Sequence, residues 1–486
     1  MEIKIISDAK TQECDVLVVN MFEGKKTTED IANKYALEED KFEGKFGTTY
    51  LLPTYGKQPA RKILVIGFGK KEEFNPDKLR QAVAKSIKKA MQIEAKSVAF
   101  DLQDIDFDYA EQFTYGAKIA DYSFDKYKNK KDKKVETVYV NATKDLVEKA
   151  DIITKAMKLT RDLANEPAQY ATPTKLAEVA ESFGLETKIY DKEECEKMGM
   201  GAYIAVSKGS SQPPKFIHMK YTCQNPKKRI AIIGKGMCFD SGGLDIKPAS
   251  SMLTMKDDMS AAACILGVMS VIKEFHPDVE VNGIIAACEN MPGCSAYKPG
   301  DILTAKNGKT IEVDNTDAEG RLTLADALCY ADELGVDEII DLATLTGACV
   351  VALGTVAAGI VGNNDELVKS NELKNILNKY VIENNIDISK IPIGKGKRIN
   401  ILQKNYILGN KYLNKLQEYE LKETICGTKR NSYYKTDHDA TAMVLKEDYY
   451  SKLSNDFHAA YNTQVIVSSL LILMYGVYQD RSDYYT

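Results

Sequence analysis

The first third of the chain alternates short apolar, β-branched runs with longer stretches in which apolar and charged residues recur at helical spacing. The runs at 63–67, 97–100 and 137–140 are typical of buried strands, and 76–95 has the pattern of an amphipathic helix. Strands that alternate with helices indicate an α/β domain with a mostly parallel sheet. We therefore expect a smaller N-terminal α/β domain over residues 1–144.

A second series of the same kind follows a long helical pattern at 145–163, which stops before Asn165-Glu166-Pro167. We expect this helix to join the two domains, and a larger C-terminal α/β domain with a central mixed sheet to occupy residues 145–486. Its clearest elements are strands at 229–233, 280–288 and 338–343 and helices at 259–275 and 321–334.

Composition narrows the classes of protein to which this chain can belong. The 486 residues are 44% hydrophobic and 28% charged, which excludes disordered and low-complexity chains. The net charge of −5 makes a nucleic-acid or membrane-surface partner unlikely, and we expect the lysine-rich run at 126–134 to be a solvated loop. We expect a cytoplasmic protein without a membrane partner. The ten cysteines are scattered, the N-terminus does not resemble a signal peptide, and no apolar run reaches membrane-spanning length.

A glycine-bearing turn, 67–70, follows one of the predicted strands and offers one alternative function. Such a turn superficially suggests phosphate binding, and hence a nucleotide-binding α/β protein. It lacks the spacing and the Lys-Ser/Thr ending of a P-loop, and no third glycine completes a dinucleotide fingerprint.

Three segments of the second half concentrate acidic and basic residues just past predicted strands or at helix starts: 234–248, 255–260 and 314–322. Ligands of open α/β sheets bind at such loops, and several acids that converge there repel one another unless a cation neutralises them. Hard divalent cations favour carboxylate oxygens, so a dinuclear carboxylate site is one interpretation. The other is that these acids are helix N-caps and first-turn residues, where the helix dipole favours negative charge. Spacing alone leaves both open.

The segment NTDAEGRL at 315–322 resembles the signature of the leucyl aminopeptidase family, the cytosol aminopeptidases of peptidase family M17. The resemblance extends over about 165–362 and includes GKGMCFDSGGLDIKP at 234–248, ENMPGCSAYKPGDI at 289–302 and DLATLTGACVVALG at 341–354. It implies a metal-dependent aminopeptidase that releases N-terminal residues, preferentially leucine and other apolar ones, from peptide substrates. It also implies assembly as a homo-hexamer.

The resemblance also implies a role for individual residues. Two divalent ions, Mn²⁺ or Zn²⁺, would be shared by five ligands, with Asp240 and Glu319 bridging, Asp317 on one ion, and Lys235 and Asp258 on the other. A ligating lysine must be neutral, and two adjacent dications supply the repulsion that lowers its pKa. Lys247 would polarise the scissile carbonyl, and Arg321 would hold a bicarbonate ion that acts as general base. The residues that match the substrate-binding positions of the family are Met255, Thr344, Leu345 and Gly347.

The chain departs from the family after about residue 393. Residues 401–486 hold 12 of the 27 tyrosines, 3 of the 31 glycines and none of the 13 prolines, and the family's closing motifs are absent. A shift this abrupt suggests a replaced segment, so we do not expect these residues to reproduce the closing strands of the family. The alternative function is therefore a catalytically impaired relative with a damaged or replaced C-terminus, which acts as a binding protein if at all.

Overall fold

The computed structural model describes residues 1–24, 42–353 and 358–363. The described chain forms two compact units, each with its own sheet. The first holds Met1–Asn165 and Leu266–His276, and the second holds Glu166–Ile265 and the described residues from Pro277 onward. A smaller N-terminal α/β region followed by a larger α/β region with a mixed sheet confirms the expected fold class.

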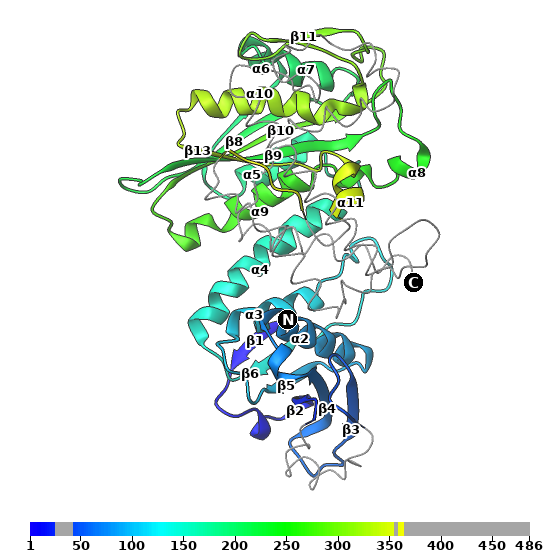
Figure 1. Cartoon of the computed structure of the whole chain (residues 1–486), viewed down its shortest axis with the longest axis vertical. Coiled ribbons are helices and arrows are strands. Elements are labelled where there is room, and N and C mark those ends of the chain that lie inside the picture. Colours follow the sequence, from blue (N-terminus) through cyan, green and yellow to red (C-terminus); the bar gives the residue numbers. More distant parts are fainter. Residues whose placement is uncertain (25–41, 354–357, 364–486) are drawn as a thin grey trace, which may run out of the picture. The chain divides into compact units, whose positions relative to one another are not determined.

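The first unit is built on a six-stranded sheet (Figure 1). Its strands run parallel except for β3 at one edge, which pairs antiparallel with β4. The three strands expected from β-branched runs are present. In spatial order, the sheet contains β1 (Glu2–Ile5), β6 (Thr137–Val140), β5 (Ser97–Asp101), β2 (Cys14–Phe22), β4 (Ala60–Gly69) and β3 (Thr49–Pro53).

The helices of the first unit bury one apolar face each. Helix α2 begins where Asn75 accepts a hydrogen bond from the backbone N–H of Lys78 (3.0 Å), with Pro76 at its first position. Its residues Leu79, Val83 and Ile87 recur every four positions and pack on the sheet. The remaining helical elements are α3 (Ala110–Ala120), α4 (Lys144–Asn165), and the short η1 (Ala9–Thr11) and η2 (Lys71–Glu73), with α2 spanning Pro76–Gln92.

The turn expected at 67–70 is wrong in its position: β4 continues through Gly69, so Gly67 and Gly69 lie within the strand, where they serve packing. The N–H of Gly67 donates to Thr48 O (2.8 Å), and the N–H of Gly69 donates to Gly44 O (2.9 Å). A Cβ at Gly67 would lie 2.1 Å from Lys45 O, so only glycine lets the two backbones approach. Because the N–H groups of both glycines already have partners within the sheet region, they are not available to a phosphate, and the nucleotide-binding alternative loses its support.

The second unit is built on a five-stranded mixed sheet. The neighbours β13, β9 and β10 are parallel, whereas β8 is antiparallel to β10 and β7 is antiparallel to β8. A separate two-stranded ribbon pairs β11 (Ile302–Thr304) with β12 (Thr310–Glu312). In spatial order, the main sheet contains β13 (Glu338–Leu342), β9 (Arg229–Asp240), β10 (Glu280–Asn290), β8 (Lys215–Tyr221) and β7 (Glu186–Tyr190).

Helices cover both faces of this sheet (Figure 1). α10 (Glu319–Glu333) and α7 (Gly201–Ser207) pack on β9 and β10 around buried Tyr203 and Phe216, and α5 (Pro173–Glu181) lies on the opposite face. α9 begins in this unit and ends in the first. The other helical elements are α6 (Lys192–Lys197), α8 (Ala249–Met252), η3 (Met255–Asp257), α9 (Ser260–Phe275), η4 (Thr316–Ala318) and α11 (Gly347–Leu353).

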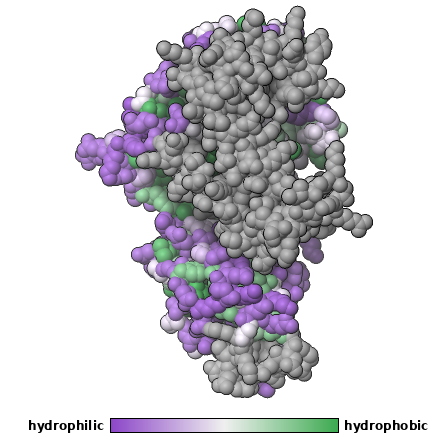
Figure 2. Space-filling model, in the orientation of Figure 1, coloured by the Kyte–Doolittle hydropathy of each residue, from purple (hydrophilic) through white to green (hydrophobic). Residues whose placement is uncertain are grey.

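The surface visible in the described ranges is mainly hydrophilic and the cysteines there are not paired, as the composition leads us to expect. Figure 2 shows mainly hydrophilic residues on the visible part of the described surface, with smaller hydrophobic patches between them. None of the helices in the described ranges is both long and apolar enough to cross a bilayer. The nine cysteines in those ranges are free thiols. The expectation about the closing strands falls on residues that lie outside the described part of the chain.

Candidate metal centre

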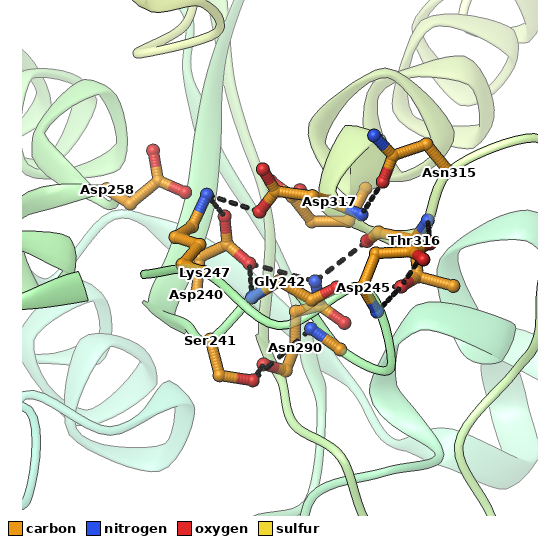
Figure 3. A network of polar contacts seen from close by, with 12 residues as sticks. Asp240, Ser241, Gly242, Asp245, Lys247, Asp258, Asn290, Asn315, Thr316 and Asp317 are labelled. Atoms are coloured by element: carbon orange, nitrogen blue, oxygen red, sulfur yellow. Dashed lines mark hydrogen bonds and ion pairs between the residues drawn. The ribbon is translucent and has the colours of Figure 1, made fainter. Parts of the chain in front are cut away.

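The three acidic segments meet beyond the carboxyl ends of β9 and β10 (Figure 3). β9 carries Lys235 and ends at Asp240, whereas Asp258 directly follows η3. Asp317 lies within η4, and Glu319 is the first residue of α10. Because β9 and β10 are parallel, the segments that follow them leave the same edge of the sheet, where an α/β fold places its ligands.

Three of the four expected carboxylates form one cluster. One oxygen each of Asp240, Asp317 and Glu319 lies within 4.8 Å of the other two. Asp240 is 2% exposed and Glu319 is 1% exposed, whereas Asp317 is half-buried. Carboxylates this close and this buried repel one another and lose their hydration, so the arrangement requires positive charge nearby.

Lys235 supplies part of that charge and connects Asp258 to the cluster. Its Nζ lies 2.8 Å from Asp258 Oδ2 and 2.9 Å from Glu319 Oε1. Burial alone would lower the pKa of Lys235, but the two carboxylates outweigh it and hold the pKa above its ordinary value. Burial likewise raises the pKa values of Asp258 and Glu319, and Lys235 opposes this rise. Without a metal, Lys235 is therefore an ammonium ion and not a neutral ligand.

Lys247 supplies the second positive charge. Its Nζ pairs with Asp240 Oδ2 at 2.7 Å and also with Asp317 Oδ1 (Figure 3). Burial works against the charged form, but the hydrogen bonds to the two carboxylates prevail and raise the pKa of Lys247.

The two lysines leave the site short of positive charge and of donors. Four carboxylates face two ammonium groups, so a formal charge of about −2 remains in a largely buried place. Among the described residues, Glu319 Oε2 has no polar partner, whereas Glu319 Oε1, Asp258 Oδ2 and Asp317 Oδ1 face the ammonium groups of Lys235 and Lys247. Buried carboxylate oxygens are normally hydrogen-bonded or bound to a metal. These residues therefore fit divalent cations.

The loop after β9 is fixed to the 315–317 segment by short hydrogen bonds. Asp245 Oδ2 accepts from the backbone N–H of Thr316 (2.7 Å), and the hydroxyl of Thr316 donates to Gly242 O (2.7 Å). Gly242 has a φ of 88°, and a Cβ there would lie 2.4 Å from Asp245 O. Only glycine allows this left-handed turn, which returns the chain toward Lys247.

Gly320 has a second steric role in the site. A Cβ at this position would lie 2.9 Å from Nζ of Lys235 and 2.9 Å from Leu345 Cδ1. Glycine at the start of α10 therefore leaves the space through which Lys235 reaches Glu319. The N-terminus of α10 also places the carboxylate of Glu319 at the positive end of the helix dipole.

The four expected substrate-binding residues differ in how closely they approach the carboxylates. The Thr344 hydroxyl lies 2.8 Å from Asp258 Oδ1, and Thr344 O accepts from Lys235 Nζ at 3.1 Å, so Thr344 belongs to the cluster. Leu345 approaches the cluster beside Gly320. The partly buried Met255 opens η3, three residues before Asp258, and exposed Gly347 opens α11. The side chain of Arg321 is exposed, in the first turn of α10.

Polar residues that the sequence does not reveal support the carboxylates. Asn290, fully buried at the end of β10, donates to Asp240 Oδ1 (2.8 Å) and to Thr316 O (3.0 Å). The hydroxyl of Tyr297 also donates to Thr316 O (2.7 Å). Both residues lie in the segment 289–302 that carries part of the resemblance, but an isolated asparagine or tyrosine has no spacing that indicates its partner.

Comparisons with known proteins identify the family of the chain. The model described as "Cytosol aminopeptidase family, catalytic domain" matches residues 158–377, and the one described as "Cytosol aminopeptidase family, N-terminal domain" matches residues 18–131. Residues 378–486 lie outside both matches.

Three similar curated proteins each bear the name "Probable cytosol aminopeptidase". The protein from Sulfurihydrogenibium sp. (strain YO3AOP1) is 48% identical over 360 residues, which are 70% of each chain. The protein from Persephonella marina is 47% identical over 348 residues, 68% of this chain and 70% of that one. The protein from Aquifex aeolicus is 42% identical over 384 residues, 75% of this chain and 78% of that one. The chain therefore belongs to the cytosol aminopeptidase family.

Proposed function

We propose that this chain is a metal-dependent aminopeptidase that releases N-terminal amino acids, preferentially leucine and other apolar residues, from peptides. The observation that carries the proposal is the buried cluster of Asp240, Asp317 and Glu319, whose ligand atoms lie within 4.8 Å of one another. Membership of the cytosol aminopeptidase family supports the peptidase activity. The unmet negative charge of the cluster supports the metal.

The proposed ligands are five residues that meet at the edge of the sheet. Two divalent ions, Mn²⁺ or Zn²⁺, would supply Lewis-acid polarisation of the scissile carbonyl, a nucleophile from water at neutral pH, and a ligand position for the free α-amine of a peptide. Asp240 and Glu319 would hold the ions together with Asp317, the third member of the cluster. The proposed ligand set is Lys235, Asp240, Asp258, Asp317 and Glu319.

Lys235 must change its protonation state when metal binds. In the metal-free protein, Asp258 and Glu319 raise its pKa and keep it charged. Dications on the same carboxylates would replace this attraction with repulsion, which favours loss of the proton and frees the amine lone pair for coordination. Metal binding should therefore release a proton at this residue.

Lys247 and Arg321 are the proposed catalytic residues. Lys247 is a cation that already reaches the cluster, so it can turn its ammonium toward the oxygen of a scissile carbonyl and stabilise the negative charge that develops there. Arg321 is exposed two residues beyond Glu319, and its planar guanidinium suits a bidentate oxyanion such as bicarbonate. A held bicarbonate would accept and return protons during hydrolysis.

The same proposal covers the substrate-binding segment and the assembly. Thr344 and Leu345 lie beside Lys235 and Asp258, where a peptide backbone would pass, and Gly347 and Met255 would complete the substrate-binding surface. An apolar pocket discriminates by only about 1–3 kcal/mol per methylene, so we expect a broad preference for apolar residues. We also expect a cytoplasmic homo-hexamer, with neither a membrane nor a nucleic acid as partner.

The experiment that tests this function is hydrolysis of a leucine anilide by the full chain before and after removal of metal. We expect a chelator to abolish hydrolysis, and added Mn²⁺ or Zn²⁺ to restore it. Hydrolysis that a chelator does not affect would contradict the metal mechanism. A chain that binds Mn²⁺ but does not cleave the anilide would support the alternative of a catalytically impaired relative that acts as a binding protein.

A further inference from the structure

Asn290 is a buried polar residue outside the proposed ligands and catalytic residues whose side chain contacts the cluster and the segment before Asp317. It ends β10, is 0% exposed, and donates through Nδ2 to Asp240 Oδ1 (2.8 Å) and to Thr316 O (3.0 Å), as Figure 3 shows. Both of these neighbours are acceptors, so the amide nitrogen must face them and the orientation of the side chain is determined.

One of these bonds selects the oxygen that Asp240 presents to the cluster. Asp240 Oδ1 also accepts from the backbone N–H of Gly242 (2.9 Å), so two donors occupy this oxygen. The second oxygen, Oδ2, faces Lys247 Nζ at 2.7 Å. Asn290 therefore fixes the rotation of the carboxylate and directs Oδ2 into the site.

The other bond connects Asp240 to the segment that carries the remaining acids. Thr316 is followed by Asp317, and Glu319 begins α10 three residues after Thr316. The backbone oxygen of Asn290 also accepts from the N–H (3.0 Å) and the hydroxyl (2.7 Å) of Ser241. One residue thus holds the end of β9 and the 315–317 segment at a fixed separation.

The position of Asn290 is not explained by stability alone. Its Oδ1 is buried and has no hydrogen-bond partner among the described residues, and an unmet buried acceptor is unfavourable. Asn282, on the same strand and 2% exposed, uses both ends of its amide: Nδ2 donates to Glu280 and Oδ1 contacts His218. Asn290 uses only the nitrogen, at the place where two ligand segments must be joined.

We propose that Asn290 is a positioning residue of the metal centre, which sets the separation of Asp240 from Asp317 and Glu319 and so determines the affinity for divalent metal. The inference rests on the proposed function, because it assigns the role through the proposed ligands. Residues that orient metal ligands change metal affinity about 10- to 100-fold when they are replaced.

The test is a calorimetric titration of the metal-free full chain with Mn²⁺, for the wild type, Asn290→Ala and Asn282→Ala. We expect Asn290→Ala to weaken Mn²⁺ binding about 10- to 100-fold. Asn282→Ala is the matched control, since it removes an equally buried amide from the same strand but leaves the cluster untouched, and it should bind Mn²⁺ as the wild type does. At saturating Mn²⁺, Asn290→Ala should keep the KM of the wild type for a leucine anilide.

Three results would overturn the inference. One is an unchanged Mn²⁺ affinity in Asn290→Ala, and another is an equal loss in Asn282→Ala, which would indicate a general effect of destabilising β10. If the wild type itself does not bind Mn²⁺, the proposed function fails together with the inference, whereas in the first two cases only the inference fails. If Asn290→Ala does not fold, Asn290→Ser replaces it, because serine retains one donor. We expect Asn290→Ser to lose less Mn²⁺ affinity than the 10- to 100-fold range. Wild-type affinity in Asn290→Ser would also count against the inference.

Discussion

Strand β10 carries a buried polar network at each end, and the two networks differ in what they lack. At its start, Glu280 lies 3.0 Å from Lys220 Nζ and 3.3 Å from Arg229 Nε, and it accepts a hydrogen bond from Asn282 at 3.1 Å. Burial raises the pKa of Glu280, but these donors outweigh it and hold the pKa below its usual range. The protein itself therefore supplies the hydrogen-bond donors and the positive charge that the Glu280 carboxylate needs.

His218 continues the first network without an unmet group. Its Nε2 lies 2.9 Å from Asn282 Oδ1, and its Nδ1 lies 2.9 Å from the hydroxyl of Tyr330. Because Asn282 uses its nitrogen for Glu280, its oxygen faces His218, so Nε2 carries the proton and Nδ1 accepts from Tyr330. Both ring nitrogens are therefore satisfied while the ring is neutral.

At the other end of the strand, the acids are not satisfied by the protein. Glu319 Oε2 has no hydrogen-bond donor among the described residues, Oε1 shares the ammonium of Lys235 with Asp258, and burial raises the pKa of Glu319. The same sheet thus holds one buried acid with a full set of donors and another without them. Burial of an acid therefore does not by itself mark a ligand site; several buried acids that converge with too little positive charge do.

The largest expected effect separates these two acids. Glu319→Gln removes a charged ligand from the cluster, so hydrolysis of a leucine anilide should fall by orders of magnitude, about 1,000-fold or more, and Asp317→Asn should behave similarly. Glu280→Gln should keep activity near that of the wild type but lower stability by about 2 kcal/mol, because it weakens charged hydrogen bonds. Steady-state rates and urea unfolding measure the two effects. Full activity in Glu319→Gln would refute the site assignment.

The next effect separates binding of metal from chemistry within the cluster. Lys247→Ala should lower kcat about 100- to 1,000-fold, since the ammonium acts on charge that develops in the transition state. Its metal content should stay at the wild-type level, as measured by elemental analysis after dialysis. Arg321→Ala should be milder, because water or solutes partly replace a held bicarbonate. Loss of both metals in Lys247→Ala would mean that this residue holds the metal site together.

A smaller effect concerns the network around His218. Burial lowers the pKa of His218 below its ordinary value of 6.5, so the unfolded chain binds the proton more readily than the folded one. Stability from the neutral ring is present above pH 6.5 and is lost as the pH falls through the lower, folded pKa. Urea unfolding at pH 7.5 and 5.5 should therefore show a steeper loss for the wild type than for His218→Gln. Equal losses would show that His218 does not titrate in this way.

Another effect on stability alone concerns Asp341, a buried acid that has neither a full set of donors nor a place in the cluster. Its Oδ1 has no hydrogen-bond partner in the described structure, and burial raises its pKa from 3.8 to about 7. Stability is therefore lost as the pH rises from about 4 through 7. Asp341→Asn should raise the melting temperature more at pH 8 than at pH 5. A uniform shift at both pH values would contradict this account.

The sequence was sufficient for the elements whose pattern is local. β-branched runs located β4, β5 and β6, and the helical spacing at 76–95 located α2, because burial of an alternating or helical face follows from order along the chain. The acidic segments could be identified because each carries several charged residues within a short span. Which residues support them could not, since Asn290 meets Thr316 only when two distant segments fold together.

The protonation state of Lys235 could not be predicted from the sequence either. A resemblance assigns it as a neutral ligand, but its charge depends on the balance between burial and the two carboxylates beside it. Likewise, nothing in the sequence around 67–70 indicates that Gly67 lies against the backbone oxygen of Lys45, where only glycine fits. Both outcomes depend on contacts between residues far apart in the chain or on the dielectric environment.

The most direct test of the central claim is the number of divalent ions that the full chain binds. Metal-free protein would be dialysed against Mn²⁺, and bound manganese would be measured by elemental analysis for the wild type and for Glu319→Gln, with Glu280→Gln as the control. We expect about two ions per chain in the wild type and in the control, and fewer in Glu319→Gln. Stoichiometric binding that persists in Glu319→Gln, or no binding by the wild type, would contradict it.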